Sequence, residues 1–205
     1  MKPRKATRLV VLLFLAAAVT IAIIRISSTR RLPATIEERA EKAFSYARRK
    51  GMNENYCLLV DYSISSGQPR LFVWSFSENR VVYSGHVMHG PGRGSTDKEP
   101  VFSNTPGSNC SSLGRFEVTR KRGSKNRTGL RLKGLDRTNN KAYTRGIMIH
   151  GSRWVDAKRW HKYIPLNGKS CRGCVTVSTR DMAYINRLVE KEKKNLLLWA
   201  YYDAA

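Results

Sequence analysis

Two stretches decide the fold of this chain: Ile147-Met148-Ile149-His150-Gly151 and Ser170-Cys171-Arg172-Gly173-Cys174-Val175-Thr176. Each contains an apolar, β-branched run of the kind that forms buried strands. The first run ends at a histidine, and the second begins directly after a cysteine that lies 24 residues further along the chain. The pair suggests a thiol nucleophile with its base.

The residue types at these positions suit nucleophilic catalysis. A histidine can accept the proton of a thiol and so produce the reactive thiolate. Gly173, immediately before Cys174, allows a tight turn and a close approach of substrate to the backbone. Taken alone, His150 at the end of a strand could equally be a packed histidine bonded to the backbone, so the remaining sequence must support the catalytic interpretation.

The composition indicates one folded domain with a short appendage. The chain has 205 residues, 41% of them hydrophobic, which suits a packed core. Its 38 Lys and Arg against 15 Asp and Glu give a net charge of +23. This charge indicates either an anionic partner or a surface that is merely basic. The basic residues are scattered and form no recognisable nucleic-acid module, so we expect no nucleic-acid partner.

The N-terminus resembles an export segment. Basic residues precede an apolar run of 16 residues at positions 9–24. That length lies between a signal-peptide core of about 7–15 residues and a spanning helix of about 17–25. Because the small residues 16–18 lie inside the run, we favour an uncleaved anchor. We expect residues 1–31 to form a cytoplasmic tip and membrane segment, with the remainder exported.

The rest of the chain predicts a mainly β domain over residues 55–205. A capping box from Thr35 to Glu38 predicts an amphipathic helix within a linker at 32–54, and Thr179 is expected to cap a second helix over 180–193. Alternating or continuous apolar runs predict the strands. They lie at 56–62, 71–76, 81–88, 116–119, 130–132, 147–149 and 175–177, with a closing strand at 196–202.

Several sequence blocks carry a family resemblance. They are Val87-Met88-His89-Gly90, Phe102-Ser103-Asn104, Ser111-Ser112-Leu113-Gly114-Arg115-Phe116, Gly129-Leu130-Arg131-Leu132-Lys133-Gly134-Leu135, Ile149-His150-Gly151 and Gly173-Cys174. They occur in the order seen in the murein L,D-transpeptidase catalytic-domain family, part of the YkuD-type cysteine L,D-transpeptidases. The resemblance covers roughly residues 55–180.

This resemblance implies a mixed, barrel-like β-sheet with a few peripheral helices and an exported setting in the bacterial cell envelope. It implies Cys174 as nucleophile and His150 as base, with the carbonyl of Gly151 orienting the ring and backbone N–H groups around Gly173 forming an oxyanion hole. The implied partner is a peptidoglycan stem peptide. A thiolate would attack a tetrapeptide stem and expel its terminal D-alanine, and an amine, or water in a carboxypeptidase, would resolve the thioester. No cofactor or metal is expected.

The substrate site is expected to include Arg172, His89, Ser112, Phe116 and Arg153. Cationic side chains near the thiol would lower its pKa and bind substrate carboxylates. His89 has two open interpretations, since it could line the cleft or end a strand.

The chain departs from the family pattern before the nucleophile. Ser or Thr is usual three positions earlier and His is frequent two positions earlier, whereas this chain has Cys171 and Arg172. We expect Cys171 to replace the serine, although a disulfide to Cys174 would silence the nucleophile. A redox motif is disfavoured because a strand-like run follows, and zinc bound with His161 matches no known spacing.

Three other questions stay open at the level of sequence. Cys57 and Cys110 could form a structural disulfide in an exported domain. The same fold could hydrolyse the stem instead of transferring it. A non-catalytic, basic wall-binding domain is the alternative from a different class.

Overall fold

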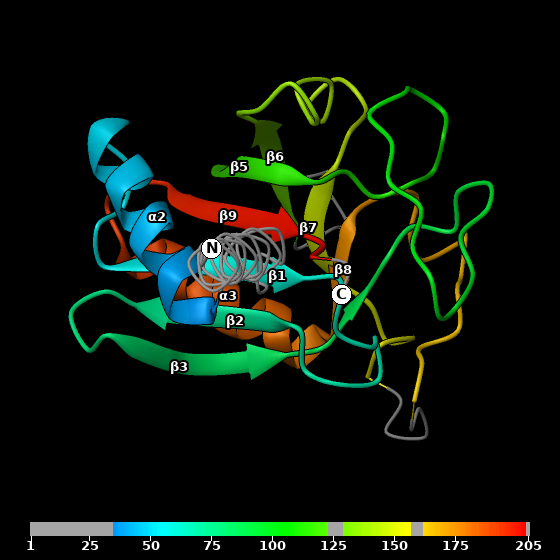
Figure 1. Ribbon diagram of the computed structural model, residues 1–205, viewed down its shortest axis with the longest axis horizontal. Helices are drawn as coiled ribbons and strands as arrows, with labels where there is room; N and C mark the ends of the chain where they lie inside the picture. Colours follow the sequence, from blue (N-terminus) through cyan, green and yellow to red (C-terminus); the bar gives the residue numbers. More distant parts are fainter. Residues whose placement is uncertain (1–34, 123–128, 157–161, 204–205) are drawn as a thin grey trace, which may run out of the picture. The chain divides into compact units, whose positions relative to one another are not determined.

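A computed structural model describes residues 35–122, 129–156 and 162–203 of the chain. It shows a mainly β domain, as predicted, with one nine-stranded sheet and two helices in the described residues (Figure 1). The predicted membrane segment at 1–31 lies outside these residues. Within the described part of the chain, no helix has the length and apolar character needed to cross a membrane.

The strands follow the predicted runs closely. They are β1 (Tyr56–Asp61), β2 (Leu71–Ser75), β3 (Arg80–Gly85), β4 (Val87–Met88), β5 (Gly114–Arg122), β6 (Leu130–Gly134), β7 (Met148–Gly151), β8 (Val175–Val177) and β9 (Leu196–Tyr201). Their order across the sheet is β3-β2-β1-β9-β5-β6-β7-β8-β4. The pairings are antiparallel except for two parallel ones, β1 with β9 and β7 with β8.

The sheet curls until its two ends meet. Its end strands β3 and β4 are consecutive in the chain, and only His86 separates Gly85 from Val87. The chain therefore passes directly from one edge of the sheet to the other, which gives the nearly closed, barrel-like form that was expected. The single strand predicted at 81–88 is divided at this corner. Gly85 belongs there because a Cβ atom would lie 2.6 Å from the carboxylate of Asp181.

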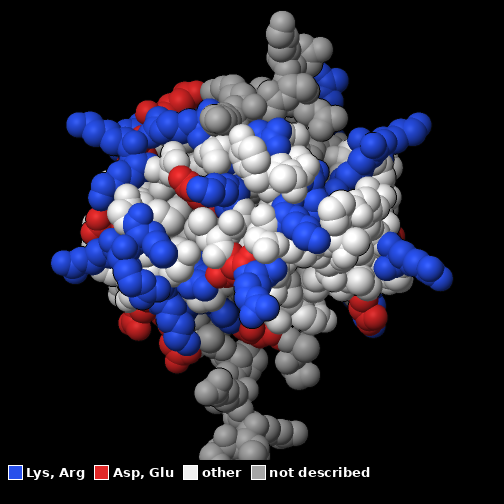
Figure 2. Space-filling model, turned by 90° about the horizontal axis from the view of Figure 1, so that it is seen from above, with Lys and Arg blue, Asp and Glu red and all other residues white. Residues whose placement is uncertain are grey.

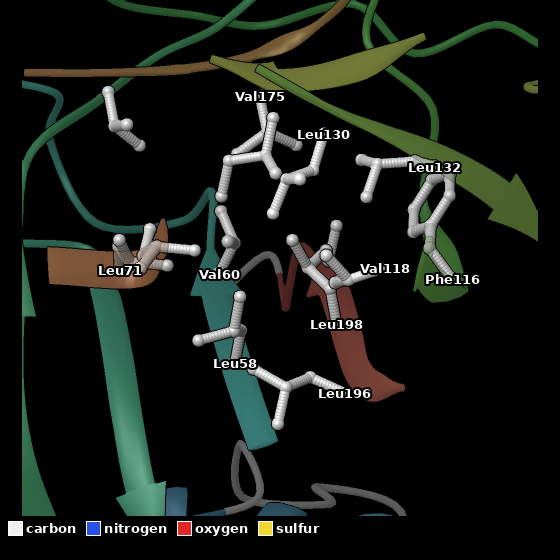
Figure 3. Close-up of a cluster of buried hydrophobic side chains, with 14 of the residues drawn as sticks. Leu58, Val60, Leu71, Phe116, Val118, Leu130, Leu132, Val175, Leu196 and Leu198 are labelled. Carbon is white, nitrogen blue, oxygen red and sulfur yellow. The ribbon is translucent and has the colours of Figure 1, made fainter. Parts of the chain in front are cut away.

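Alternating side chains divide the sheet into an inner and an outer face. The inner face forms the main apolar core (Figure 3). Its labelled members are Leu58, Val60, Leu71, Phe116, Val118, Leu130, Leu132, Val175, Leu196 and Leu198. Helix α3 (Thr179–Lys191) closes this core with Met182, Ile185 and Leu188. Because the side chains of a strand alternate, the neighbours of these residues point to the outer face.

Two different structures cover the outer face. Helix α2 (Ile36–Arg49) packs Ala40, Ala43 and Ala47 against β1, β2 and β9, on the side of the sheet opposite α3 (Figure 1). At the other end, loop residues cover β4, β7 and β8 in a smaller apolar cluster of Met88, Met148, Val155, Ile164, Cys171 and Cys174. We call this the thiol cluster. Strands β5 and β6 lie between the two coverings.

The capping residue was predicted correctly for one helix and incorrectly for the other. Thr35 caps α2 as predicted, accepting a hydrogen bond from Glu38 N at 3.2 Å. The cap of α3 is Ser178 and not Thr179, since Ser178 Oγ accepts from Asp181 N at 2.9 Å. Thr179 is instead the first helical residue, and its hydroxyl donates to Asp156 at 2.6 Å.

Candidate active site

Parallel pairing of β7 and β8 brings the two sequence stretches together. His150 lies opposite Thr176 in the register, and Cys174 immediately precedes β8. Cys174 and Thr176 are two residues apart, so both lie on the outer face with His150. Cys174 and His150 are 7% and 9% exposed. The site therefore lies at a protected end of two adjacent strands.

The hydrogen bonds of His150 define which ring nitrogen can act as a base. Nδ1 lies 3.2 Å from the carbonyl oxygen of Gly151, and Nε2 lies 3.3 Å from Thr176 Oγ1. A carbonyl oxygen can only accept, so Nδ1 carries the proton of the neutral ring. Nε2 is then the unprotonated nitrogen. This is the tautomer that a general base at Nε2 requires.

Gly173 is required by the turn that leads into Cys174. Its φ of +94° lies in the region that favours glycine. A Cβ atom there would also lie 2.4 Å from the carbonyl oxygen of Cys110. Any other residue would have to move either the 108–112 loop or Cys174 itself.

Cys171 is a buried thiol with a structural contact. It is 2% exposed, and its Sγ donates to the carbonyl oxygen of Cys174 at 3.3 Å. Burial raises the pKa of Cys171 to about 12, so the side chain stays a neutral thiol. All four cysteines of the chain lie in the described residues, and none of them forms a disulfide. The structure thus contains neither a Cys171–Cys174 nor a Cys57–Cys110 disulfide.

Arg145 is a residue that the sequence did not single out. Its Nη1 donates to Ser103 O at 2.8 Å and to Ser112 Oγ at 2.6 Å. Its Nη2 donates to Cys110 O at 2.8 Å and lies 3.2 Å from the position of a Cβ on Gly173. The guanidinium therefore fastens the 103–112 loop beside the turn that carries Cys174.

The charge of Arg145 is coupled to the thiol. Burial lowers the pKa of Arg145, whereas its interactions with the Cys110 and Cys174 thiols raise it. A cation at this place favours the thiolate form of Cys174. The sequence offered no signal for this role, because Arg145 is one of 38 basic residues and its partners lie more than 30 residues upstream.

His89 occupies a buried structural position. It is fully buried, its Nδ1 lies 3.0 Å from Arg70 Nη2, and its Nε2 lies 2.8 Å from the carbonyl oxygen of Thr96. Burial, followed by the charge of Arg70, lowers the pKa of His89 to about 4. With a neutral ring and both nitrogens engaged, His89 anchors the loop after β4. This geometry favours the structural one of its two interpretations.

The other predicted substrate residues separate into two groups. Phe116 is 1% exposed and points into the main core, so it does not face the thiol. The Ser112 hydroxyl is buried, donates to Ser103 O at 2.8 Å and accepts from Arg145. Arg172 and Arg153 are exposed. Their side chains are available to a ligand, whereas Phe116 and Ser112 support the fold around the site.

The zinc alternative finds no support in the described part of the chain. His161, its proposed fourth ligand, lies outside the described residues. Within 35–122, 129–156 and 162–203, no three His, Cys, Asp or Glu side chains gather as a metal-binding group.

The fold defines a class: a mainly β domain in which the paired strands β7 and β8 bring a histidine and a cysteine to the same face of the sheet. A family model described as the L,D-transpeptidase catalytic domain matches residues 29–201. The chain belongs to this family, as the sequence blocks predicted.

Solved structures show distant similarity. The helical cell shape determining protein Pgp2 from Campylobacter jejuni is 13% identical with a TM-score of 0.47, covering 74% of this chain and 50% of that one. A mutant of Pgp2 gives 14% identity and a TM-score of 0.48, with 74% and 49% coverage. An L,D-transpeptidase from Xylanimonas cellulosilytica gives 15% identity and a TM-score of 0.39, with 77% and 68% coverage.

This chain thus spans about half the length of the Pgp2 structures. A search of curated proteins finds no match.

Proposed function

We propose that this chain is a peptidoglycan L,D-transpeptidase that uses Cys174 as its nucleophile and His150 as its general base. The observation that carries the proposal is the pairing of β7 with β8, which places a Nδ1-protonated His150 on the strand beside Cys174. Membership of the L,D-transpeptidase catalytic-domain family supplies the class of substrate.

The proposed reaction transfers an acyl group twice. His150 Nε2 accepts the proton of the Cys174 thiol, and the thiolate attacks the carbonyl carbon of the third residue of a tetrapeptide stem. The C–N bond to the terminal D-alanine breaks, and the imidazolium returns its proton to the leaving amine. The amine of a second stem then attacks the thioester, giving a new amide and the free thiol.

Backbone groups are proposed to stabilise the tetrahedral intermediates. The turn at Gly173 has a fixed, left-handed backbone conformation, which would aim the N–H groups at this turn toward the developing oxyanion. Arg172 and Arg153, both exposed, are the proposed contacts for carboxylates of the stem. These roles need no cofactor.

We also propose that the domain works outside the cytoplasm, in the bacterial cell envelope, held by the apolar segment within residues 1–31.

Product analysis tests the proposed function. The protein is incubated with disaccharide-tetrapeptides, and the products are identified by mass spectrometry. Cross-linked dimers support transfer, and tripeptides alone would show that the same site hydrolyses the stem. Unchanged substrate in the presence of reductant contradicts both enzymatic readings of the site.

A further inference from the structure

Thr176 is a polar residue at the centre of β8, and it is completely buried. It lies opposite His150 in the parallel pairing with β7 and opposite Met88 in the antiparallel pairing with β4. Threonine side chains mostly face water, whereas Thr176 is 0% exposed. A buried hydroxyl lowers stability unless it forms hydrogen bonds. Thr176 therefore needs a polar partner inside the protein, and the ring of His150 lies within reach.

The imidazole of His150 is contacted at both of its nitrogens. The carbonyl oxygen of Gly151 lies 3.2 Å from Nδ1, and Thr176 Oγ1 lies 3.3 Å from Nε2. Because Nδ1 carries the proton that the carbonyl accepts, the Thr176 hydroxyl donates to the unprotonated Nε2. Threonine is β-branched and has few side-chain rotamers, so the position of Oγ1 is well defined. The orientation of the ring thus depends on one backbone contact and one side-chain contact.

A hydroxyl can serve both protonation states of this ring. It donates to Nε2 of the neutral imidazole, and the same oxygen can accept a hydrogen bond after Nε2 has taken the proton of the Cys174 thiol. The second hydrogen bond is the stronger one, because its donor is charged. Thr176 would therefore stabilise the imidazolium of His150 more than the neutral ring, and this favours the thiolate of Cys174.

Cys171 gives the hydroxyl proton of Thr176 a second acceptor. Cys171 Sγ donates to Cys174 O at 3.3 Å, and its sulfur lone pairs can still accept. Burial, followed by the charge of Cys174, raises the pKa of Cys171, and a hydrogen bond with Thr176 opposes this rise. A hydrogen bond has this effect when the hydroxyl donates to the sulfur. The hydroxyl can thus turn from Nε2 to Cys171 Sγ when the ring becomes charged.

The contact between Thr176 and His150 is shielded from the exposed charges of the chain. His150 is only 9% exposed, and a Cβ atom on Gly129 would lie 2.6 Å from its Cβ. Figure 2 shows Lys and Arg spread over the face that it views, with acidic and uncharged surface between them. Solvent and salt screen charges of this kind. A single buried hydrogen bond can therefore affect the base more than a distant surface charge does.

Other titratable groups surround the site and must be considered in any pH measurement. The Cys171 thiol lies in the thiol cluster, and Arg145 interacts with the Cys174 thiol. Tyr62, which follows β1, interacts with both thiols. All of these groups are retained when Thr176 is replaced, so a comparison of Thr176 variants isolates the hydroxyl.

We propose that Thr176 is a positioning residue for the base: its hydroxyl holds Nε2 of the neutral His150 ring and then accepts the hydrogen bond of the imidazolium. The proton on Nε2 comes from the Cys174 thiol and leaves with the departing amine, so Thr176 has no net gain or loss of a proton. The inference rests on the proposed function only in taking His150 as the base for Cys174.

The ionisation of Cys174 in the full chain tests this inference. Iodoacetamide alkylation at Cys174 is measured against pH by mass spectrometry, together with kcat and KM for tetrapeptide transfer. Thr176→Val keeps the shape of the side chain without its hydroxyl. We expect its alkylation midpoint to move to higher pH and its kcat to fall about ten-fold, with KM within about two-fold, because a charge-assisted hydrogen bond is lost.

Three further variants serve as controls. Thr176→Ser keeps the hydroxyl and should have the midpoint of the parent and a kcat within about three-fold of it. Thr176→Ala also lacks the hydroxyl, so its midpoint should move in the same direction as that of Thr176→Val, whichever of the two folds better. Thr119→Val is the matched control, since it removes a β5 hydroxyl that donates to Arg131 O at 2.9 Å. It should leave the midpoint unchanged.

A second background shows whether Thr176 acts through the histidine. In a chain carrying His150→Ala, the addition of Thr176→Val should cause no further shift, because the partner of the hydroxyl is gone. The inference is overturned if Thr176→Val and Thr176→Ala keep the midpoint of the parent, if Thr176→Ser shifts it equally, or if the shift persists without His150. Alkylation needs no stem peptide, so a shifted midpoint in a chain that transfers no tetrapeptide would refute the proposed function alone. Transfer with an unshifted midpoint would refute only the role of Thr176.

Discussion

The two thiols of the Cys171–Cys174 segment have different environments, although they are only three positions apart. Cys171 is sealed in the thiol cluster and bonded to the carbonyl of Cys174. Cys174 enters β8 beside the strand of His150. Burial favours a neutral thiol at position 171, whereas position 174 has a histidine on the neighbouring strand and the cation of Arg145 beside its turn.

This difference predicts opposite outcomes for two serine variants. Cys174→Ser should lose transfer activity by at least about a thousand-fold, because a serine hydroxyl is far less ionised than a thiol. Cys171→Ser should keep activity within about ten-fold, because a hydroxyl can still donate to the Cys174 carbonyl. Product formation from disaccharide-tetrapeptides measures both. An inactive, folded Cys171→Ser protein would show that the roles are assigned incorrectly.

Arg145 should set the ionisation of the nucleophile. Arg145→Gln removes the cation, so the pKa of the Cys174 thiol should rise and less thiolate should be present near neutral pH. Arg145→Lys keeps the positive charge, so the pKa of the Cys174 thiol should stay close to that of the parent protein. The pH dependence of iodoacetamide alkylation at Cys174, followed by mass spectrometry, measures this. A purely structural role for Arg145 predicts the same midpoint in all three proteins.

His89 should make the stability depend on pH. Its pKa falls from an ordinary 6.5 to about 4 on folding, so the unfolded chain binds the extra proton between these values. The contribution of His89 is complete above pH 6.5 and is lost as the pH falls toward 4, by at most roughly 3 kcal/mol.

His89→Gln removes this proton while keeping a polar side chain. The melting temperature of the parent should therefore decline more steeply between pH 6.5 and 4 than that of the variant. Parallel declines would show that His89 does not titrate in this way.

Local sequence was enough to predict some of these residues and not others. The contact between His150 and the Gly151 carbonyl joins adjacent residues, and the turn at Gly173 was visible from its position before Cys174. The burial of Phe116 depends on which face of β5 meets the core. The role of Arg145 depends on a loop distant in the sequence, which a local pattern does not reveal.

At the scale of elements, the hydrophobic runs predicted the strands well. Period-two alternation marked Leu71–Ser75, and continuous apolar runs marked Tyr56–Asp61 and Leu196–Tyr201. The division between β3 and β4 was missed because the apolar residues on either side of Ser84-Gly85-His86 were joined into one strand. What ends β3 is the change of sheet edge at Gly85, and this is a tertiary effect.

The cap of α3 supports an element-level prediction. Ser178→Ala should lower the free energy of unfolding by about 1 kcal/mol, because it leaves Asp181 N without its acceptor. Ser178→Asn supplies a carbonyl oxygen and should recover most of that loss. Urea denaturation measures both variants. Equal losses in the two would indicate that packing, rather than capping, determines the effect.

At the scale of the whole molecule, the charge of +23 predicts salt-sensitive attachment to an anionic wall. Binding of the chain to purified sacculi should weaken several-fold when the salt concentration rises from about 0.05 to 0.5 M. Co-sedimentation measures this. If sacculus binding does not change with salt concentration, the positive charge does not attract the chain to the wall.

The strand order was the property least accessible from sequence. Periodicity shows which residues face the core, but not which strands are neighbours. The pairing of Cys57 with Leu197 joins opposite ends of the domain, and the last strand enters the middle of the sheet, between β1 and β5.

The position of β9 also constrains when the protein can fold. A ribosome makes β1 to β8 first, yet strand pairing joins β1 to β3 with the group β4 to β8 only through β9. Until residue 201 has emerged, the inner core lacks Leu196, Leu198 and Ala200 from its centre. The growing chain therefore cannot complete its sheet early.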